Sequence, residues 1–520
     1  MNGADLLCDS LLAQEVELCF ANPGTSEMHF VAALDRKPRL RCVLGLHEGV
    51  VTGAADGYAR MADKPAATLL HTGPGLANGL ANLHNARRGH TPMINIVGDH
   101  AAYHLVHDAP LTSDIESLAR PMSKWVRRIA GPETIAEDVG QAWQAALALR
   151  GPATLILPAD AAWGEVPPGG KGTPAALPAP VAPPVADSAV AAAAAILRGG
   201  GRCGLLLTGR ALRADALETA GRIAAATGAG LFSQTSNGRV ERGAGRVPVT
   251  RIPYPVDQAL ATLGHLEALI LVGAADPVAF FAYPNKPSRL LPEGCALLRL
   301  AAIEEDLPGA LEALAEALGA GRAVPAYAEA GGTAPEPPAS GRLDADGVCA
   351  LVARLLPEQA VVCDESVSSG RDFYRLSAAS PPHDYLQLTG GAIGVGIPLA
   401  TGAAIACPGR KVVSLQADGS GLYTVQGLWT QAREQLDVVT VVFANRAYAI
   451  LQGEMRNVGV NSFGRNAERM LSLDSPPVDW VGLARSLGVE AVRVESLEAL
   501  DRAFRGALAT RGPFLIECLT

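Results

Sequence analysis

The sequence lacks several features that would point to other classes of protein. Its nine cysteines are odd in number and scattered, and no C-x-x-C pair occurs. We therefore expect neither a disulfide framework nor a zinc ribbon, but a reducing, cytoplasmic setting. No apolar stretch approaches the roughly 20 residues of a membrane helix, so no membrane partner is expected. The first residues carry Asp5 and Asp9 and no basic segment, which is not the pattern of a signal peptide.

Positive charge is also scarce. The chain has 43 Lys and Arg residues against 52 Asp and Glu residues, a net charge of -9, and no basic run or stripe. A nucleic acid is therefore not expected as a main partner. A hydrophobic content of 49% with 18% charged residues indicates a globular protein. At 520 residues the chain is too long for one core, and about 150 residues per domain suggests three domains.

The first 165 residues alternate strand and helix patterns. Strands are predicted at 16–21, 42–46, 66–71, 92–98 and 154–157, and helices near Glu27, over 49–61 and over 76–88. Strands that alternate with helices imply a parallel sheet with right-handed crossovers.

Two linkers divide the remaining chain. Residues 166–187 hold seven prolines and are predicted to form a semi-rigid linker, and residues 329–341, rich in Ala, Pro and Gly, form a second one. Between them, residues 188–328 form a central α/β segment with strands at 204–208 and 268–272. No G-x-G-x-x-G turn follows either strand, so a dinucleotide site is not indicated there.

Residues 342–520 alternate in the same way as the first unit. Strands are predicted at 360–363, 385–388, 411–416, 438–444, 489–494 and 514–518, and helices near 395–406, 422–435 and 497–509. The predicted fold class is therefore α/β, with three doubly wound parallel-sheet domains.

Polar residues follow the strands of the first unit. The ends of three strands deliver residues 22–25 (including Thr25), His47 with Glu48, and His71 before a glycine-rich turn. Open parallel sheets bind ligands at the carboxyl ends of their strands, so a hydroxyl, a carboxylate and an imidazole are expected in one crevice. Acidic residues also favour helix N-termini, and a single histidine is usually structural, so position alone leaves both interpretations open.

A second set of polar residues lies in the last unit. Asp418 follows one predicted strand and Asn445 ends the next, 27 residues later, which is the length of one βαβ unit. A carboxylate and an amide oxygen suit Mg²⁺, which normally adds phosphate oxygens and water. A helix that begins near Ser420 would direct free N–H groups to the same place. The alternative is a simple Asp-Gly turn with a capping Asn.

Two further patterns are weaker. Residues 390–398 contain four glycines that include Gly391 and surround Ile393, which suits either close approach of a ligand or helix–sheet packing. His100, His104 and His107 with Asp108 look like a zinc set, but the stretch lacks helix patterning, so a structural or loop role is preferred.

With these residues in view, the chain resembles, over nearly its whole length, thiamine diphosphate (ThDP)-dependent enzymes of the acetohydroxyacid synthase, pyruvate oxidase and benzoylformate decarboxylase group. Residues 417–420 through Asn445 resemble the G-D-G-S…N cofactor motif, with Ala417 in place of the first glycine. Residues 47–59 resemble the segment that bears the catalytic glutamate. Residues 120–124 and 151–158 resemble the end of the first domain of these enzymes.

Two local features are similar to benzoylformate decarboxylase in particular. Residues 22–27 match its Asn-Pro-Gly-Ser segment, with Thr25 in place of the active-site serine, and His71 matches its strand-end histidine. The second active-site histidine of that enzyme has no counterpart at 281–285, which argues against the same activity on aromatic substrates. The turn at 71–75 also resembles that of acetohydroxyacid synthases.

The resemblance implies a role for each unit and each candidate residue. Residues 1–165 would bind the pyrimidine and residues 342–520 the diphosphate, with Mg²⁺ held by Asp418, Asn445 and the backbone carbonyl of Ala447. Glu48 would activate the cofactor, Ile393 would hold it bent, and His71 and Thr25 would face the substrate. The other cofactor contacts implied are Ser366, Ser368, Gly391, Gly419, Ser420 and Tyr448.

The function that this resemblance implies is non-oxidative decarboxylation of a 2-oxo acid through an enamine intermediate, with possible carboligation. One alternative is an acetohydroxyacid (acetolactate) synthase-like transferase. Another is a catalytically silent binding protein, against which the intact Glu48, Asp418 and Asn445 speak. Some relatives bind FAD without a redox role; the central segment has no motif that settles whether FAD binds, and its absence is the preferred expectation. The resemblance also implies a homodimer or homotetramer with active sites between subunits.

Overall fold

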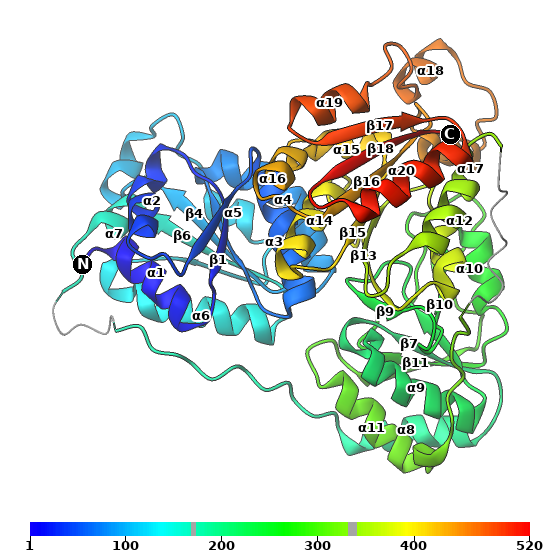
Figure 1. Ribbon diagram of the computed structural model, residues 1–520. Helices are drawn as coiled ribbons and strands as arrows, with labels where there is room; N and C mark the ends of the chain where they lie inside the picture. Colours follow the sequence, from blue (N-terminus) through cyan, green and yellow to red (C-terminus); the bar gives the residue numbers. More distant parts are fainter. Residues whose placement is uncertain (168–172, 331–340) are drawn as a thin grey trace.

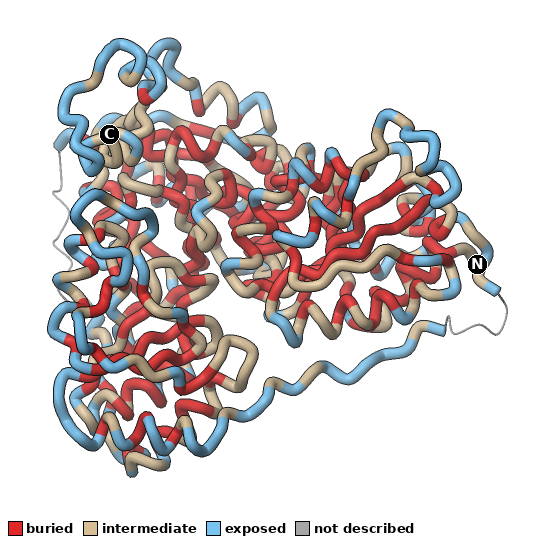
Figure 2. Tube along the Cα trace, turned by 180° about the vertical axis from the view of Figure 1, so that it is seen from behind, coloured by how far each residue is buried: buried red, intermediate tan, exposed pale blue. Residues whose placement is uncertain are grey.

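The computed structural model describes residues 1–167, 173–330 and 341–520. They form three α/β units, which follow one another from blue to red in Figure 1. Each unit is built on a mostly parallel sheet, so the predicted fold class is confirmed. Most inner strands of the sheets, such as β4 (Met93–Asp99), β6 (Pro152–Pro158), β11 (Ala268–Val272) and β16 (Val438–Ala444), are buried over their whole length because helices cover both faces of each sheet. Figure 2 shows the buried parts of the chain in red.

The first sheet is parallel throughout, in the order β2-β1-β3-β4-β6-β5. The sequence did not predict α1 or β5, and β5 is a half-buried edge strand without an apolar run. The strands are β1 (Leu18–Asn22), β2 (Arg41–Leu44), β3 (Ala67–Leu70), β4 (Met93–Asp99), β5 (Trp125–Arg128) and β6 (Pro152–Pro158), and the helices are α1 (Gly3–Ala13), α2 (Met28–Asp35), α3 (Glu48–Ala62), α4 (Thr72–Arg88), α5 (Ile115–Ala119), α6 (Ile135–Ala148) and α7 (Ala159–Trp163).

Helix α4 begins at Thr72, four residues before the predicted start at Leu76. Pro74 lies in its first turn, where a missing N–H removes no helical hydrogen bond. The glycine-rich stretch after His71 is therefore the first turn of a helix and not a separate loop. His71 is the N-cap residue of this helix.

The second sheet has the order β10-β8-β7-β11-β12 and is also parallel. The linker before it, residues 173–186, runs extended along the surface and is mostly exposed, as Figure 2 shows. The strands are β7 (Cys203–Leu207), β8 (Gly230–Ser233), β10 (Thr250–Arg251), β11 (Ala268–Val272) and β12 (Ala296–Ala301), and the helices are α8 (Asp187–Arg198), α9 (Ala214–Thr227), α10 (Val256–Leu263) and α11 (Leu307–Leu318).

The third sheet has the order β17-β18-β16-β15-β13-β14-β9, and β9 is antiparallel to its neighbour β14. The edge strand β9 (Val240–Arg242) comes from the central segment, and its three residues are too few to form a pattern in the sequence. The other strands are β13 (Val361–Glu365), β14 (His383–Gln387), β15 (Val412–Ala417), β16 (Val438–Ala444), β17 (Glu490–Val494) and β18 (Phe514–Leu519).

The helices of the third unit include one correction to the sequence prediction. The single helix expected over 422–435 is wrong: the segment forms the one-turn helix α15, a 3₁₀ turn at Leu422–Thr424, and α16. Gly421 and Gly427 weaken a continuous helix here, and the Thr424 hydroxyl donates to the Gly394 carbonyl instead. The helices are α12 (Ala345–Leu355), α13 (Phe373–Leu376), α14 (Gly396–Ala406), α15 (Asp418–Gly421), α16 (Gly427–Arg433), α17 (Ala449–Asn457), α18 (Arg465–Leu471), α19 (Trp480–Ser486) and α20 (Leu497–Ala509).

The first and third units pack against each other through α3 and α14, which lie side by side in Figure 1. The backbones approach so closely that a Cβ atom at Gly402 would lie 1.8 Å from the Ala54 carbonyl oxygen, and one at Gly57 would lie 2.0 Å from that of Leu399. Only glycine fits at these two positions. The packing therefore fixes the N-terminal end of α3 relative to the third unit.

One buried arginine joins all three units. Arg60 on α3 forms a bidentate pair with Asp56, with distances of 2.7 and 2.6 Å, and both side chains are almost fully buried. Its Nη1 donates to the carbonyls of Gln387 in the third unit, at 2.7 Å, and Gly238 in the central segment, at 3.2 Å. Because a buried charge needs both a partner and hydrogen bonds, this arginine requires the three units to keep their arrangement.

All nine cysteines are unpaired. Within the described ranges, no helix has the length and apolar character that a bilayer span requires.

Candidate active site

Glu48 is the first residue of α3, at the carboxyl end of β2, and its side chain is buried beside the first turns of α4. His47 caps the helix by accepting the Gly49 N–H at its Nδ1, at 3.0 Å. The Asn78 amide donates to Glu48 Oε2 at 3.0 Å, and Glu48 is only 5% exposed. A buried carboxylate held by a side-chain amide of the neighbouring helix is the arrangement expected of a functional acid and not of a solvated cap.

His71 lies against the end of β1, as the sequence predicted. A Cβ atom at Gly24 would lie 2.2 Å from the His71 ring, so the imidazole packs directly on this turn. The ring Nδ1 lies 2.9 Å from a Glu27 carboxylate oxygen, and the Glu27 side chain has no exposed surface. An Nδ1–H that donates to this carboxylate leaves Nε2 as the basic nitrogen, free to exchange a proton with a ligand.

Glu27 was not identified from the sequence, although it holds this corner together. Its carboxylate also accepts the Gly24 N–H at 2.7 Å and the Ser26 hydroxyl at 2.8 Å. The Ser26 hydroxyl lies 3.3 Å from His71 Nδ1, whereas Thr25 is exposed. The hydroxyl that contacts the imidazole is thus that of Ser26. The signal in the sequence that could have identified Glu27 is its position three residues after Gly24, in the turn that follows β1.

Asp418 and Asn445 end the neighbouring strands β15 and β16, as the sequence predicted. The Asp418 carboxylate accepts the N–H groups of Gly419 at 2.8 Å and Arg446 at 2.7 Å. The Asn445 amide oxygen accepts the Ala447 N–H at 3.0 Å. Among the described residues Asp418 forms no ion pair although it is only 5% exposed, and burial raises the pKa of its carboxyl.

A hard cation would suit this arrangement. A buried carboxylate with only backbone donors still has free lone pairs, and Mg²⁺ favours one or two carboxylates together with neutral oxygens. No cluster of three or more His, Cys, Asp or Glu side chains that could hold a metal is found in the described parts of the chain. The residues present therefore fit a cation that takes most of its ligands from phosphate and water, as Mg²⁺ does.

Three loops at these strand ends carry a non-glycine residue in the left-handed region. Thr72 follows β3 with φ 48°, Val367 follows β13 with φ 52°, and Arg446 follows β16 with φ 56°. Such a conformation is strained, above all for the β-branched Thr and Val, and strained residues concentrate at functional sites. The strain lies where the first and third units both place their candidate residues.

The serines predicted to contact the diphosphate differ in the hydrogen bonds that their hydroxyls already form. The buried Ser366 donates to Asp364, and Ser420 accepts the Gln416 amide at 2.7 Å. Ser368 is half-buried, and its neighbour Ser369 accepts the Asn445 amide at 3.3 Å, a contact that the sequence did not suggest.

The helix predicted to begin near Ser420 is α15, which begins at Asp418 and has only four residues. Of its N–H groups, that of Gly419 donates to the Asp418 side chain. The ring of Tyr448 lies against this turn, since a Cβ atom at Gly419 would lie 2.5 Å from its Cε1, and burial raises the pKa of Tyr448. The Tyr448 ring therefore leaves no room for a side chain at position 419, so only glycine fits there.

The loop that carries Ile393 is held from two sides. The buried Glu365 accepts the N–H groups of residues 394, 395 and 396 at 2.7, 3.0 and 2.8 Å, and burial raises the pKa of its carboxyl. From the first unit, Asn85 donates to the Ala392 carbonyl at 2.7 Å and accepts the Gly390 N–H at 3.1 Å. Glu365 and Asn85 were not identified from the sequence. Together they fix the position of the half-buried Ile393.

The central segment reaches the same loop. A Cβ atom at Gly391 would lie 2.6 Å from the ring of Phe280, whose centroid lies 5.0 Å from that of Phe281. Phe280 and Phe281 thus lie directly before and at the start of the segment 281–285, which contains no histidine.

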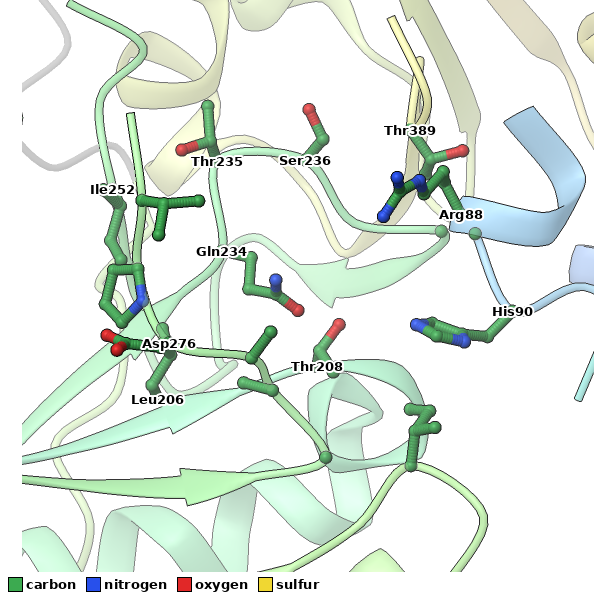
Figure 3. A pocket seen from close by; sticks show the side chains of 18 of the residues that line it. Arg88, His90, Leu206, Thr208, Gln234, Thr235, Ser236, Ile252, Asp276 and Thr389 are labelled. Carbon is green, nitrogen blue, oxygen red and sulfur yellow. The ribbon is translucent and has the colours of Figure 1, made fainter. Parts of the chain in front are cut away.

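A cavity of about 770 Å³ opens beyond this contact, at the carboxyl ends of the central strands. In Figure 3, Thr208 and Gln234 from the central sheet face Arg88 and His90 from the first unit. Burial, followed by the charge of Lys124, lowers the pKa of His90 to about 4. The absence of FAD stays a prediction, since a cavity of this size could hold a large ligand.

The histidine cluster of the first unit lies on a 3₁₀ turn, Ala102–His107. The ring centroids of His100 and His104 are 5.6 Å apart, and those of His104 and His107 are 5.5 Å apart. The preference for a structural or loop role over zinc stays a prediction.

Comparison with known proteins agrees with this geometry. Residues 1–118 match the family "Thiamine pyrophosphate enzyme, N-terminal TPP binding domain", and residues 368–518 match its C-terminal TPP binding domain, thiamine pyrophosphate being ThDP. A Mycobacterium tuberculosis protein named "Putative acetolactate synthase large subunit IlvX" is 48% identical over 522 residues, which cover 99% of this chain and 98% of that protein.

Two further relatives are decarboxylases by name. Benzoylformate decarboxylase of Pseudomonas aeruginosa is 29% identical over 96% of this chain and 95% of its own. The structure of the ThDP-dependent 4-hydroxybenzoylformate decarboxylase of Rhodococcus jostii RHA1 superposes with a TM-score of 0.87 at 26% identity, covering 100% of this chain and 99% of that one. The chain belongs to the thiamine pyrophosphate-dependent enzyme family of the acetohydroxyacid synthase and benzoylformate decarboxylase group.

Proposed function

We propose that the chain is a ThDP- and Mg²⁺-dependent enzyme that decarboxylates a 2-oxo acid without oxidation, with possible carboligation. The observation that carries this proposal is the orientation of His71 by the buried Glu27, which leaves Nε2 available at the strand ends beside Glu48. When bound, ThDP supplies a nucleophilic carbon and accepts the electron pair that CO₂ leaves behind. A product-forming proton must then come from a positioned group such as the His71 imidazole.

The other residues would hold the cofactor. Asp418, Asn445 and the carbonyl of Ala447 would bind Mg²⁺, and the diphosphate would lie against Ser366, Ser368, Gly419, Ser420 and Tyr448. Glu48 would hydrogen-bond the pyrimidine and promote its tautomer change, while Gly391 and Ile393 would shape the cofactor into its bent form. Two observations support this assignment. Asp418 is buried and forms no ion pair with a Lys, Arg or His side chain among the described residues, which suits a ligand of Mg²⁺. The loop that carries Ile393 is held in position by hydrogen bonds from two sides.

We also propose that a second copy of the chain completes the site, as a dimer or a tetramer. Large apolar side chains next to the candidate residues are exposed: Leu46 is 43% exposed, Tyr423 55% and Met470 75%. Leu46 lies two residues before Glu48, and Tyr423 packs against Gly394. Such side chains near a polar crevice are typical of a surface that another subunit covers.

A second candidate function is an acetolactate synthase-like transferase, favoured by the relative of that name at 48% identity. Both reactions begin with loss of CO₂ from a 2-oxo acid. They differ in the electrophile that then reacts with the remaining carbanion equivalent. A proton gives an aldehyde, and a second oxo acid gives a hydroxy acid with a new carbon–carbon bond. The position of His71 favours the proton, and the pair Phe280 and Phe281 offers an apolar wall for the substrate side chain.

The test is a panel of 2-oxo acids assayed with ThDP and Mg²⁺, in which CO₂ release and the organic product are measured together. The proposal expects CO₂ and aldehyde in equal amounts for at least one substrate. An acetohydroxy acid as main product would establish the second candidate, whereas a hydroxy-ketone would show that the enzyme of the first proposal carries out carboligation. No CO₂ from any substrate would support the silent binding protein. A colourless protein after purification would fit the prediction that FAD is absent, and absorbance near 450 nm would contradict it.

A further inference from the structure

A second cavity lies between the central and third units. It measures about 460 Å³ and is lined by β9, β10 and the turn that joins them on one side and by the segment around α13 on the other. None of the residues proposed to bind ThDP, Mg²⁺ or the 2-oxo acid lines it. The proposed reaction therefore leaves this cavity without a use.

The lining carries a marked excess of positive charge. It contains five arginines and a single acid, Asp372, which gives a formal charge of +4 in a chain whose net charge is -9. Of the five, only Arg375 forms an ion pair with a carboxylate in the described parts of the chain, to Asp372 at 3.2 Å. The arginines are Arg242, Arg246, Arg251, Arg371 and Arg375.

Arg242 is the least expected of these residues, because it is only 8% exposed and lacks a carboxylate partner. Its guanidinium donates to the Ser377 hydroxyl and the Tyr374 carbonyl, and it lies 3.7 Å from the centre of the Tyr374 ring. Neutral acceptors satisfy its N–H groups but do not balance its charge, and burial lowers its pKa. A buried charge without a counter-charge costs several kcal/mol unless something else compensates it.

Aromatic rings hold the neighbouring arginines in position. Arg251 lies 4.8 Å from the centre of the Tyr374 ring, and its Nη2 reaches the Arg371 carbonyl at 3.4 Å. Arg371 lies 5.6 Å from the centre of the Tyr254 ring. Guanidinium groups placed by stacking keep their N–H donors free for a ligand, whereas paired arginines do not. The site is therefore formed before any anion arrives.

We propose that this cavity binds a small phosphate monoester. Several unpaired guanidinium groups match a phosphate dianion, because each can donate two parallel N–H groups to its oxygens. Val247, Val249, Pro248 and Pro255 supply an apolar wall, and Tyr254 supplies a ring face, for the organic part of the ester. A volume of about 460 Å³ is enough for a phosphate with one ring attached.

The sequence gives no sign of this site. The arginines come from residues 242–251 and 371–375, which are more than a hundred residues apart, and neither segment forms a basic run. They meet only because β9 leaves the central unit to pair with β14 of the third sheet. A function for this antiparallel strand, apart from extending the sheet, is to carry Arg242 into the cavity.

The test is isothermal titration calorimetry of the full chain with phenyl phosphate and with inorganic phosphate, at constant ionic strength. The titration is made with and without saturating ThDP and Mg²⁺, so that binding at the cofactor site is recognised. We expect saturable binding of one phenyl phosphate per chain that ThDP does not displace. The double variant Arg251→Gln with Arg371→Gln should bind at least tenfold more weakly. Both residues lie at the rim of the cavity, so the fold should survive, which thermal unfolding checks.

The matched control is Arg202→Gln, which removes the same charge from an exposed ion pair with Glu267 far from the cavity. It should bind phenyl phosphate like the parent chain. The proposal is overturned if the parent shows no saturable binding of either probe, if the double variant binds within twofold of the parent, or if Arg202→Gln weakens binding equally. Displacement of phenyl phosphate by ThDP would assign it to the cofactor site and overturn the proposal as well.

Discussion

His71 Nδ1 lies 2.9 Å from a carboxylate oxygen of Glu27, a side chain with no exposed surface. Glu27 belongs to the turn after β1 and His71 to the end of β3, so the contact joins two adjacent strands of the first sheet. A buried carboxylate that accepts an imidazole N–H fixes the tautomer and the orientation of the ring. Glu27 is therefore a positioning residue for the imidazole that we propose to move the proton.

Glu27→Gln should lower kcat by about tenfold to a hundredfold while the folded structure persists, because general acid–base groups contribute on the order of 10²- to 10⁴-fold and the variant misorients one. KM should change less than kcat. Glu137→Gln, on an exposed helix face, is the matched control. A kcat equal to that of the parent would remove Glu27 from the mechanism.

Glu48→Gln should keep the fold and the binding of ThDP but lose nearly all turnover, by about a hundredfold or more. The amide oxygen can still accept the hydrogen bond from Asn78, but the amide cannot carry the charge that promotes the tautomer change. The measurement is kcat beside ThDP affinity from fluorescence quenching. If kcat stayed unchanged, the assignment of Glu48 as the activating group would be wrong.

Much of the framework could be predicted from local patterns. The bounds of β11, β16 and α20 agree with the predicted ranges, because apolar runs or a strong 3.6-residue period end at clear turn residues. The spacing of Asp418 and Asn445 matches one βαβ unit, and the structure shows that the two strands are neighbours.

What the sequence could not predict are contacts between distant segments. Glu365 accepts three N–H groups of a loop about 30 residues away, and Asn85 holds the same loop from another unit. No local pattern distinguishes such residues from ordinary polar ones. The helix expected over 422–435 is interrupted by the 3₁₀ turn at Leu422–Thr424, where the Thr424 hydroxyl contacts the distant Gly394 carbonyl, and the helical period of the apolar residues did not reveal this interruption.

Asp418→Ala should abolish the Mg²⁺ dependence of ThDP binding and weaken that binding by about a hundredfold or more, since carboxylate ligands dominate Mg²⁺ affinity. The measurement is calorimetry with ThDP, with Mg²⁺ and with EDTA, for the parent and the variant. Asp474→Ala is a matched control, because Asp474 forms an exposed pair with Arg446 beside the site. Equal ThDP affinity of the parent with and without Mg²⁺ would refute the metal assignment.

The folded protein should lose stability as the pH falls from 6.5 toward 4. Burial, followed by the charge of Arg242, lowers the pKa of His383 to about 3, and His90 shifts in the same direction to about 4. In this window the unfolded state binds protons that the folded state does not, so unfolding is favoured as pH falls and the full stability is present above 6.5. A single group of this kind contributes about 3 kcal/mol by pH 4.

His383→Asn should flatten this dependence, because the amide can still donate to the Pro381 carbonyl that His383 Nδ1 reaches at 2.8 Å. The measurement is the apparent thermal unfolding midpoint of parent and variant between pH 7.5 and 4.5. The two curves should converge at low pH. Parallel curves over the whole range would show that His383 does not titrate on unfolding in this window.

A mixture of two inactive variants should recover activity if the site is shared between subunits. When Glu48 comes from one chain and Asp418 from another, a hybrid of Glu48→Gln and Asp418→Ala chains contains one site with both defects and one site with neither. Random assembly makes half of the dimers hybrid, so about a quarter of all sites should be intact. The chains are mixed by co-expression with different affinity tags, and the doubly tagged hybrid is purified and assayed. If each chain instead formed a complete site, every site in the hybrid would carry one defect and no activity would return.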